Sequence, residues 1–257
     1  MAFLEVKNLQ IAFGGLIAVK DLSFTMEKGQ ITSLIGPNGA GKTTAINLLT
    51  GFYHPDTGSI LMEGKEVAGL TCAQYVAEGV CRTFQNVRLF SGLTVEENIL
   101  VGMQHLVPYG SFLSLFPNKK KNQAEKEARE KVTEILEKIG LEQYRYTKAT
   151  NLPYGLQRKL EIGRALASKP RLLLLDEPAA GMNPQESAEL SAFIRELLNE
   201  VDAILLIEHD MKVVMGISDQ VVVINHGELI CQGTPAQVQS NPDVIEAYLG
   251  KGGKKHA

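Results

Sequence analysis

The sequence predicts an α/β protein with a mainly parallel sheet, an N-terminal antiparallel β layer and an inserted α-helical subdomain. Three observations indicate this fold class. Short alternating apolar segments occupy residues 3–26, which suits antiparallel strands. Apolar runs of strand length at 171–175 and 203–208 alternate with a helical segment, as in the βαβ units of a parallel sheet. A helical apolar pattern at 124–139 precedes them and predicts the inserted subdomain.

The bulk composition limits the classes of function. The 257 residues are enough for one large domain that carries a smaller lobe. A net charge of -3 offers no general attraction for nucleic acid, so no nucleic-acid partner is expected. Cys72, Cys81 and Cys231 include no Cys-x-x-Cys pair, which favours reduced thiols over disulfides or zinc. The apolar runs are too short to span a bilayer and no export leader is seen, so we expect neither a membrane span nor export.

The first strands and the first helix follow from the local pattern. Gly14 and Gly15 divide the alternating segment at 3–26 into two strands. Residues 30–35 form an apolar strand, and a glycine-rich turn leads from it into helical spacing at 43–49. This order of strand, loop and helix is the context that a phosphate-binding loop requires.

The helix predicted at 124–139 has one apolar face and ends at Gly140. A later helix begins with Asn183 as its N-cap, Pro184 in its first turn and Glu186 in the capping-box position. Residues 221–231 are predicted to form a hairpin. A short helix at 242–249 follows, and residues 251–257 are expected to be a flexible tail.

A phosphate-loop motif, G-x-x-x-x-G-K-[ST], lies in that strand–loop–helix context. Backbone N–H groups of such a loop surround phosphate oxygens, and a helix N-terminus favours the negative charge. We expect Lys42 to reach the β- and γ-phosphates and the Thr43 hydroxyl to bind Mg²⁺. The predicted nucleotide-binding residues of the loop are Gly36, Pro37, Asn38, Gly39, Ala40, Gly41, Lys42, Thr43 and the adjoining Thr44.

Two adjacent carboxylates, Asp176 and Glu177, end the apolar strand at 171–175. This arrangement is costly unless a cation or a reacting water uses the carboxylates. In a chain that also carries a phosphate loop, Asp176 suits Mg²⁺ and Glu177 suits the attacking water. Both residues are therefore candidates for phosphoryl-transfer chemistry.

Five motifs occur in the order typical of ABC ATPases, and the resemblance spans nearly the whole chain. They are the phosphate loop, Gln85, the segment 152–156, Asp176-Glu177 and His209. More narrowly, the chain resembles the LivG-type ATPases of branched-chain amino acid importers. The segments that carry this closer resemblance are 82–85, 105–121, 178–181, 207–211 and 241–250.

The resemblance implies a P-loop (RecA-like) nucleotide-binding core formed by 1–85 and 159–250. Residues 86–158 would then be the helical subdomain with the signature segment, Leu152–Leu156. Further site residues follow in the same way. Gln85 would contact Mg²⁺ and the water, and His209 the γ-phosphate. Phe13 would stack on adenine, although a core position is the alternative.

The signature segment departs from the family pattern Leu-Ser-Gly-Gly-Gln. The resemblance implies that Tyr154 and Gly155, at the start of a helix, face the ATP held by the opposite subunit. Pro153 offers neither a hydroxyl nor an N–H, so one charge-assisted hydrogen bond is missing and a weaker grip on ATP is expected. Asn183 stands where many relatives have an aspartate, and helix capping alone explains it.

As a function, the resemblance implies an ATPase, with ATP and Mg²⁺ as cofactors, that powers an importer of branched-chain or other neutral amino acids. The implied partners are membrane-spanning permease subunits, a second ABC ATPase subunit and, indirectly, an extracytoplasmic binding protein. The implied location is the cytoplasmic face of the membrane. ATPases of urea importers or lipopolysaccharide-type exporters, and a non-hydrolysing regulatory module, remain alternatives. The segment at 105–121 either packs on the helical lobe or docks on a permease subunit.

Overall fold

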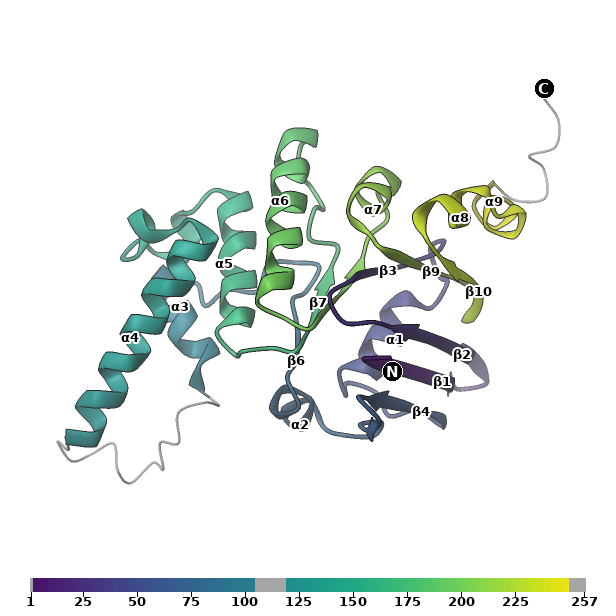
Figure 1. Cartoon of the computed structure of the whole chain (residues 1–257), viewed down its shortest axis with the longest axis horizontal. Helices are drawn as coiled ribbons and strands as arrows, with labels where there is room; N and C mark the ends of the chain where they lie inside the picture. The colour runs from purple at the N-terminus through teal and green to yellow at the C-terminus, as the bar shows by residue number, and fades with distance from the viewer. Residues whose placement is uncertain (1, 105–118, 250–257) are drawn as a thin grey trace. The chain divides into compact units, whose positions relative to one another are not determined.

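The computed structural model describes residues 2–104 and 119–249 and divides into two compact units (Figure 1). The core unit comprises Met1–Arg82 and Arg171–Ala257, and the helical unit comprises Thr83–Pro170. Most of the predicted insertion, including the apolar residues 111–116, and the predicted flexible tail lie outside the described residues.

An antiparallel sheet forms the N-terminal layer of the core unit, as predicted. Its strand order is β2-β1-β4-β5. β1 alternates buried and exposed residues because one of its faces covers the core. The strands are β1 (Leu4–Phe13), β2 (Leu16–Met26), β4 (Thr57–Met62) and β5 (Lys65–Glu66).

The second sheet of the core unit is mainly parallel, which confirms the predicted fold class. Its order is β10-β9-β3-β8-β7-β6, and all neighbouring pairs are parallel except β9 with β10. β3, β7 and β8 are buried along their whole lengths, so their sequences are nearly continuous apolar runs. The strands are β3 (Ile31–Ile35), β6 (Val80–Arg82), β7 (Leu172–Asp176), β8 (Ala203–Ile207), β9 (Gln220–Asn225) and β10 (Glu228–Gly233).

The helices of the core unit include the three predicted at 43–49, after Asn183 and at 242–249. Asn183 caps α6 by accepting from the amides of Gln185 and Glu186, and Glu186 completes the capping box. α2 was not predicted, although Thr71 and Gln74 form its capping box. The helices are α1 (Lys42–Leu49), α2 (Cys72–Ala77), α6 (Pro184–Glu196), η5 (Leu197–Asn199), α7 (Met211–Ile217), α8 (Pro235–Ser240) and α9 (Pro242–Leu249).

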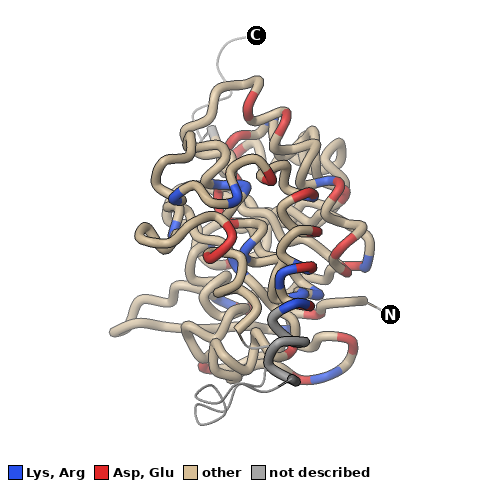
Figure 2. The backbone as a smooth tube through the Cα atoms, turned by 90° about the vertical axis from the view of Figure 1, so that its left-hand side faces the viewer, with Lys and Arg blue, Asp and Glu red and all other residues tan. Residues whose placement is uncertain are grey.

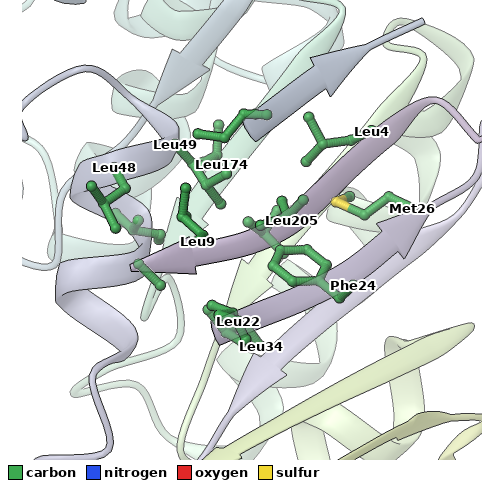
Figure 3. Packing of buried hydrophobic residues seen from close by; sticks show 14 of the residues in the cluster. Leu4, Leu9, Leu22, Phe24, Met26, Leu34, Leu48, Leu49, Leu174 and Leu205 are labelled. Atoms are coloured by element: carbon green, nitrogen blue, oxygen red, sulfur yellow. The ribbon is translucent and has the colours of Figure 1, made fainter. Parts of the chain in front are cut away.

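A hydrophobic cluster joins the antiparallel layer, α1 and the parallel sheet (Figure 3). Leu9 and Leu22 of the antiparallel layer, Leu48 of α1, and Leu174 and Leu205 of the parallel sheet are at most 1% exposed. Burial of each such side chain stabilises the fold by about 1.5–3 kcal/mol. The cluster therefore fixes β3 and α1, and with them the loop that joins these two elements.

The helical unit contains α3 (Val95–Gly102), α4 (Lys119–Ile139), η3 (Glu142–Tyr144), η4 (Ala149–Asn151) and α5 (Tyr154–Leu166). Val132 and Leu136 of α4 are buried, as the apolar pattern predicts. α4 begins at Lys119, before the predicted start at residue 124. The prediction missed its first turns because they are polar and carry no apolar periodicity. α5 continues past the expected boundary at 158 and packs on α3 and α4, so the helical unit extends to Pro170.

Basic and acidic residues are interspersed along the described backbone (Figure 2), in keeping with the small net charge. Among the residues described, no helix is both long and apolar enough to cross a bilayer.

Candidate nucleotide-binding site

The phosphate loop lies between β3 and α1, as the motif predicts. Two of its glycines are required by close backbone packing. A Cβ at Gly36 would lie 2.1 Å from the carbonyl oxygen of Ile224, and one at Gly41 would lie 2.6 Å from that of Ala18. Gly41 also has a φ of 100°, which L-residues rarely adopt. The neighbouring strands β9 and β2 therefore determine the path of the loop.

Lys42, in the first turn of α1, reaches back over the loop. Its Nζ donates hydrogen bonds to the carbonyl oxygens of Gly36 (2.6 Å) and Pro37 (3.0 Å). Burial lowers the pKa of Lys42, while Glu177 and Asp176 act in the opposite direction. Asn38, Gly39 and Thr43 are exposed and Thr44 is half-buried, so several loop residues are accessible to a ligand.

Asp176, at the carboxyl end of β7, is held by an arginine that the sequence analysis missed. Arg82 Nη2 donates to Asp176 Oδ2 at 2.7 Å, and Arg82 Nη1 donates to Asn47 Oδ1 at 2.7 Å. The Arg82 and Asp176 side chains are only 9% and 12% exposed. Arg82 thus ties the end of β7 to the helix that follows the phosphate loop. The only feature of the sequence that could have indicated this role of Arg82 was its position at the end of a short strand.

The structure brings the predicted catalytic residues Glu177 and His209 together. Glu177 Oε2 lies 3.4 Å from His209 Nδ1, because β7 and β8 are paired and both residues follow their carboxyl ends. The Glu177 amide donates to the carbonyl of Ile207 (2.9 Å), and its φ is 46°. A positive φ is unfavourable for glutamate, and such strain is common at functional sites.

Glu208 is a second residue that the sequence analysis did not assign. It is 1% exposed, and its two oxygens accept from the amides of Ala179 (3.0 Å) and His209 (3.2 Å). Burial raises the pKa of Glu208, and these hydrogen bonds oppose that shift. The carboxyl group connects the loop after Glu177 to the loop that carries His209. A carboxylate directly after a buried strand was the only sequence signal.

Phe13, the predicted adenine-stacking residue, ends β1 and is 44% exposed, so it is not a core residue. Its ring meets that of Tyr53 edge to face, with centroids 5.1 Å apart. Tyr53 is 38% exposed. The aromatic pair offers an accessible apolar surface in the core unit.

The remaining predicted residues lie in the helical unit. Gln85 is exposed in the loop after β6, and Tyr154 and Gly155 lie in the first turn of α5, with Pro153 at the N-cap. A Cβ at Gly155 would meet no atom within 4 Å, so packing within the chain does not explain this glycine. The hydroxyl of Tyr154 accepts from Arg158 Nη2 at 3.2 Å.

Within residues 2–104 and 119–249, no cluster of three or more His, Cys, Asp and Glu residues could hold a metal ion. Thr43 and Asp176 nevertheless supply the hydroxyl and carboxylate oxygens that Mg²⁺ prefers when phosphates complete its coordination. A phosphate loop, a held carboxylate and a Glu177–His209 pair, all following parallel strands, define a P-loop nucleotide-binding protein.

Comparisons with known proteins give the family. Residues 19–180 match the family model for ABC transporters, and residues 228–254 match the model for branched-chain amino acid ATP-binding cassette transporters. The chain is similar to two curated relatives over 96% of its own length and 98% of theirs. They are the high-affinity branched-chain amino acid transport ATP-binding proteins BraF of Pseudomonas aeruginosa (48% identical) and LivG of Escherichia coli (49% identical).

Similar solved structures indicate the same family. A nucleotide-free ATP-binding cassette from an ABC transporter is 33% identical, with a TM-score of 0.84, over 98% of this chain and 100% of that chain. The ADP conformation of an ATP-binding cassette is 32% identical, with a TM-score of 0.83 and the same coverage. The chain therefore belongs to the ABC transporter family, as one of its nucleotide-binding ATPases.

Proposed function

We propose that the chain is the ATP-hydrolysing subunit of an ABC importer for branched-chain or other neutral amino acids. The observation that carries the proposal is the similarity, over nearly the full length, to two relatives named for branched-chain amino acid transport. The separate match at residues 228–254 to a family model of the same description supports it. Both favour this substrate class over urea import or lipopolysaccharide export.

The site residues support hydrolysis rather than binding alone. The hydroxyl of Thr43, the carboxylate of Asp176 and the amide of Gln85 would hold Mg²⁺, which when bound neutralises charge on the β- and γ-phosphates. Lys42 would contact the same phosphates from the phosphate loop. Glu177 would orient the attacking water or accept its proton, and His209 would contact the γ-phosphate. A non-hydrolysing module has no need of the paired Glu177 and His209.

The proposed assembly contains membrane-spanning permease subunits and a second ABC ATPase subunit, with an extracytoplasmic binding protein delivering the substrate. The chain would act at the cytoplasmic face of the membrane. Gly155 supports the second ATPase subunit, because intrachain packing leaves space beside it. In this arrangement Tyr154 and Gly155 would face the nucleotide held by the opposite subunit, and ATP would favour the closed dimer.

The first test compares the wild-type chain with Glu177→Gln for ATP hydrolysis and for size on a gel-filtration column in ATP and Mg²⁺. We expect the variant to lose hydrolysis, retain nucleotide binding and accumulate as a dimer, because the amide cannot accept a proton. Lys20→Gln serves as a control, since Lys20 forms an exposed ion pair with Glu228. Wild-type turnover in the Glu177→Gln variant would contradict the assigned role of Glu177.

The second test addresses the substrate. The chain is reconstituted with its permease subunits and binding protein in vesicles, and ATP-dependent uptake of leucine and of urea is compared. Uptake of leucine and not urea is expected. Uptake of urea alone, or uptake that does not need ATP, would overturn the importer assignment.

A further inference from the structure

Arg158, on α5 of the helical unit, is completely buried and binds the backbone of the loop that carries Gln85. Its Nη1 donates to the carbonyl oxygen of Phe84 at 2.7 Å, and its Nη2 donates to that of Gln85 at 2.6 Å. The planar guanidinium therefore bridges two consecutive carbonyl groups, which fixes their direction as well as their position.

Glu161 completes the arrangement one helical turn later. Its Oε2 accepts from Arg158 Nη1 at 2.9 Å, and its Oε1 accepts from the amide of Arg88 at 3.0 Å. Glu161 is 1% exposed, so the pair is almost fully withdrawn from water. α5 thus binds the Gln85 loop at both ends: Arg158 holds residues 84 and 85, and Glu161 holds residue 88.

The same arginine contacts the signature end of α5. Nη2 of Arg158 also donates to the hydroxyl of Tyr154, four residues earlier in the helix. One side chain therefore joins the first turn of α5, which begins with Tyr154 and Gly155, to the backbone of Gln85. Among the described residues, the side-chain hydrogen bonds of Arg158 and Glu161 lie inside the helical unit.

A buried ion pair is weak evidence for a role in stability. Well-packed apolar residues often replace such a pair without loss of stability, because desolvation of the two charges offsets their attraction. The backbone contacts at residues 84, 85 and 88, by contrast, need charged, hydrogen-bonding groups in these positions. This difference points to a positional role.

We propose that Arg158 and Glu161 are positioning residues that make the Gln85 loop and the signature end of α5 move as one body. The proposal rests on the proposed function, in which Gln85 contacts Mg²⁺ and water in one ATP site and Tyr154 and Gly155 face the other. A displacement of Gln85 on nucleotide binding would then be transmitted by this pair to the signature segment. The two ATP sites of the dimer are coupled through it.

The test uses the double variant Arg158→Met/Glu161→Leu, which replaces the charges with apolar groups of similar length. The matched control is Arg145→Met/Glu96→Leu, because Arg145 and Glu96 form a mostly buried ion pair in the same unit. No hydrogen bond of that pair to residues 84–88 is found among the described residues. Hydrogen exchange of peptides covering 83–90 and 153–162 is measured with and without ADP and Mg²⁺.

We expect residues 83–90 to exchange about tenfold faster in the Arg158/Glu161 variant than in the wild type, with the core-unit strands unchanged. ADP should alter exchange in both peptides of the wild type and of the control, but only in 83–90 of the variant. Hydrogen exchange does not require ATP hydrolysis. A wild type that binds ADP but does not hydrolyse ATP would contradict the proposed function, and the exchange rates would still test the positioning role.

ATP hydrolysis by the assembled transporter gives a second readout. The variant should bind ADP within about twofold of the wild type, since the phosphate loop is untouched, while kcat falls about tenfold and any sigmoidal dependence on ATP disappears. If the double variant does not fold, Arg158→Lys and Glu161→Gln provide the same comparison with smaller changes. A folded variant with wild-type exchange at 83–90 and wild-type kcat would overturn the proposal.

Discussion

Glu177 and Glu208 follow the carboxyl ends of two paired strands, β7 and β8, but their carboxylates have different surroundings. Glu177 is partly exposed and lies beside His209, whereas Glu208 is buried and accepts backbone hydrogen bonds. The surroundings of Glu177 suit a carboxylate that contacts water, and those of Glu208 suit a carboxylate that holds two loops in place. The positive φ of Glu177 depends on the surrounding hydrogen bonds, including that from its amide to Ile207.

The titration of Glu208 gives a prediction at this scale. Burial raises its pKa in the folded protein above the ordinary value near 4.5. The native state therefore binds more protons than the unfolded state in the range between the two pKa values, and stability falls as pH rises through that range. Glu208→Gln cannot titrate. The free energy of unfolding of the wild type should fall relative to this variant as pH rises above about 4.5.

The measurement is urea denaturation of both proteins over a pH series. Glu228→Gln is the control, because it makes the same substitution at a half-exposed carboxylate, which is paired with Lys20. If the free energies of unfolding of the wild type and Glu208→Gln change with pH in parallel, the raised pKa of Glu208 is contradicted.

At the scale of elements, Arg82 connects β6, β7 and α1 at the edge where the site lies. Arg82→Met would leave Asp176 buried without its cation, and such losses cost about 3–5 kcal/mol. We expect destabilisation of this order, partly offset by ADP with Mg²⁺, because a bound cation would neutralise the carboxylate. Stabilisation by ADP with Mg²⁺ should therefore be larger in the variant than in the wild type.

Denaturant unfolding with and without ADP and Mg²⁺ checks this expectation. Lys20→Met removes an exposed ion pair and should cost less than about 1 kcal/mol. An Arg82→Met protein that is as stable as the wild type would show that the ion pair is not needed to hold Asp176.

The capping box of α6 gives a second prediction for an element. Asn183→Ala should destabilise the protein by about 1 kcal/mol, because the amides of Gln185 and Glu186 lose their acceptor. Asn183→Asp should retain the wild-type stability, since its carboxylate accepts the same hydrogen bonds. Thermal unfolding of the two variants distinguishes them, and equal melting temperatures would count against a capping role.

For the whole molecule, the altered signature segment bears on how two ATP sites are assembled. Pro153 is the N-cap of α5, with extended backbone angles that serine also adopts. Pro153→Ser would restore a hydroxyl that can donate to nucleotide in the opposite subunit. A charge-assisted hydrogen bond contributes about 1.5–3 kcal/mol, so apparent ATP affinity should increase by about tenfold or more.

ATP titration of hydrolysis by the assembled transporter checks this prediction, with Tyr146→Ser as an exposed control in the same unit. In a heterodimer only the site completed by this chain's signature segment should tighten. The other site, built on Lys42, Glu177 and His209 and completed by the partner, should keep its affinity. If Pro153→Ser leaves the ATP dependence of hydrolysis unchanged, the expectation that Pro153 weakens ATP binding is contradicted.

Two of the three capping boxes that the sequence analysis missed, those at the starts of α2 and α3, show where interpretation of local sequence patterns was incomplete. Thr71 with Gln74, and Thr94 with Glu97, have the spacing of the motif. The helices that follow are short, with six and eight residues, so their apolar periodicity is weak. By contrast, α4 was predicted because Val132 and Leu136 repeat at helical spacing over a long segment.

The sequence by itself determined the phosphate loop, the strand ending in Asp176 and Glu177, and the mainly parallel α/β fold. These features depend on residue spacing within short segments and on the order of apolar runs. Only the tertiary structure decided the partners of the charged groups. Arg82 meets Asp176 across 94 residues of sequence, and Arg158 meets Phe84 across 74. Such pairs depend on which strands and helices become neighbours, and burial then requires each charge to find a partner, which no local pattern encodes.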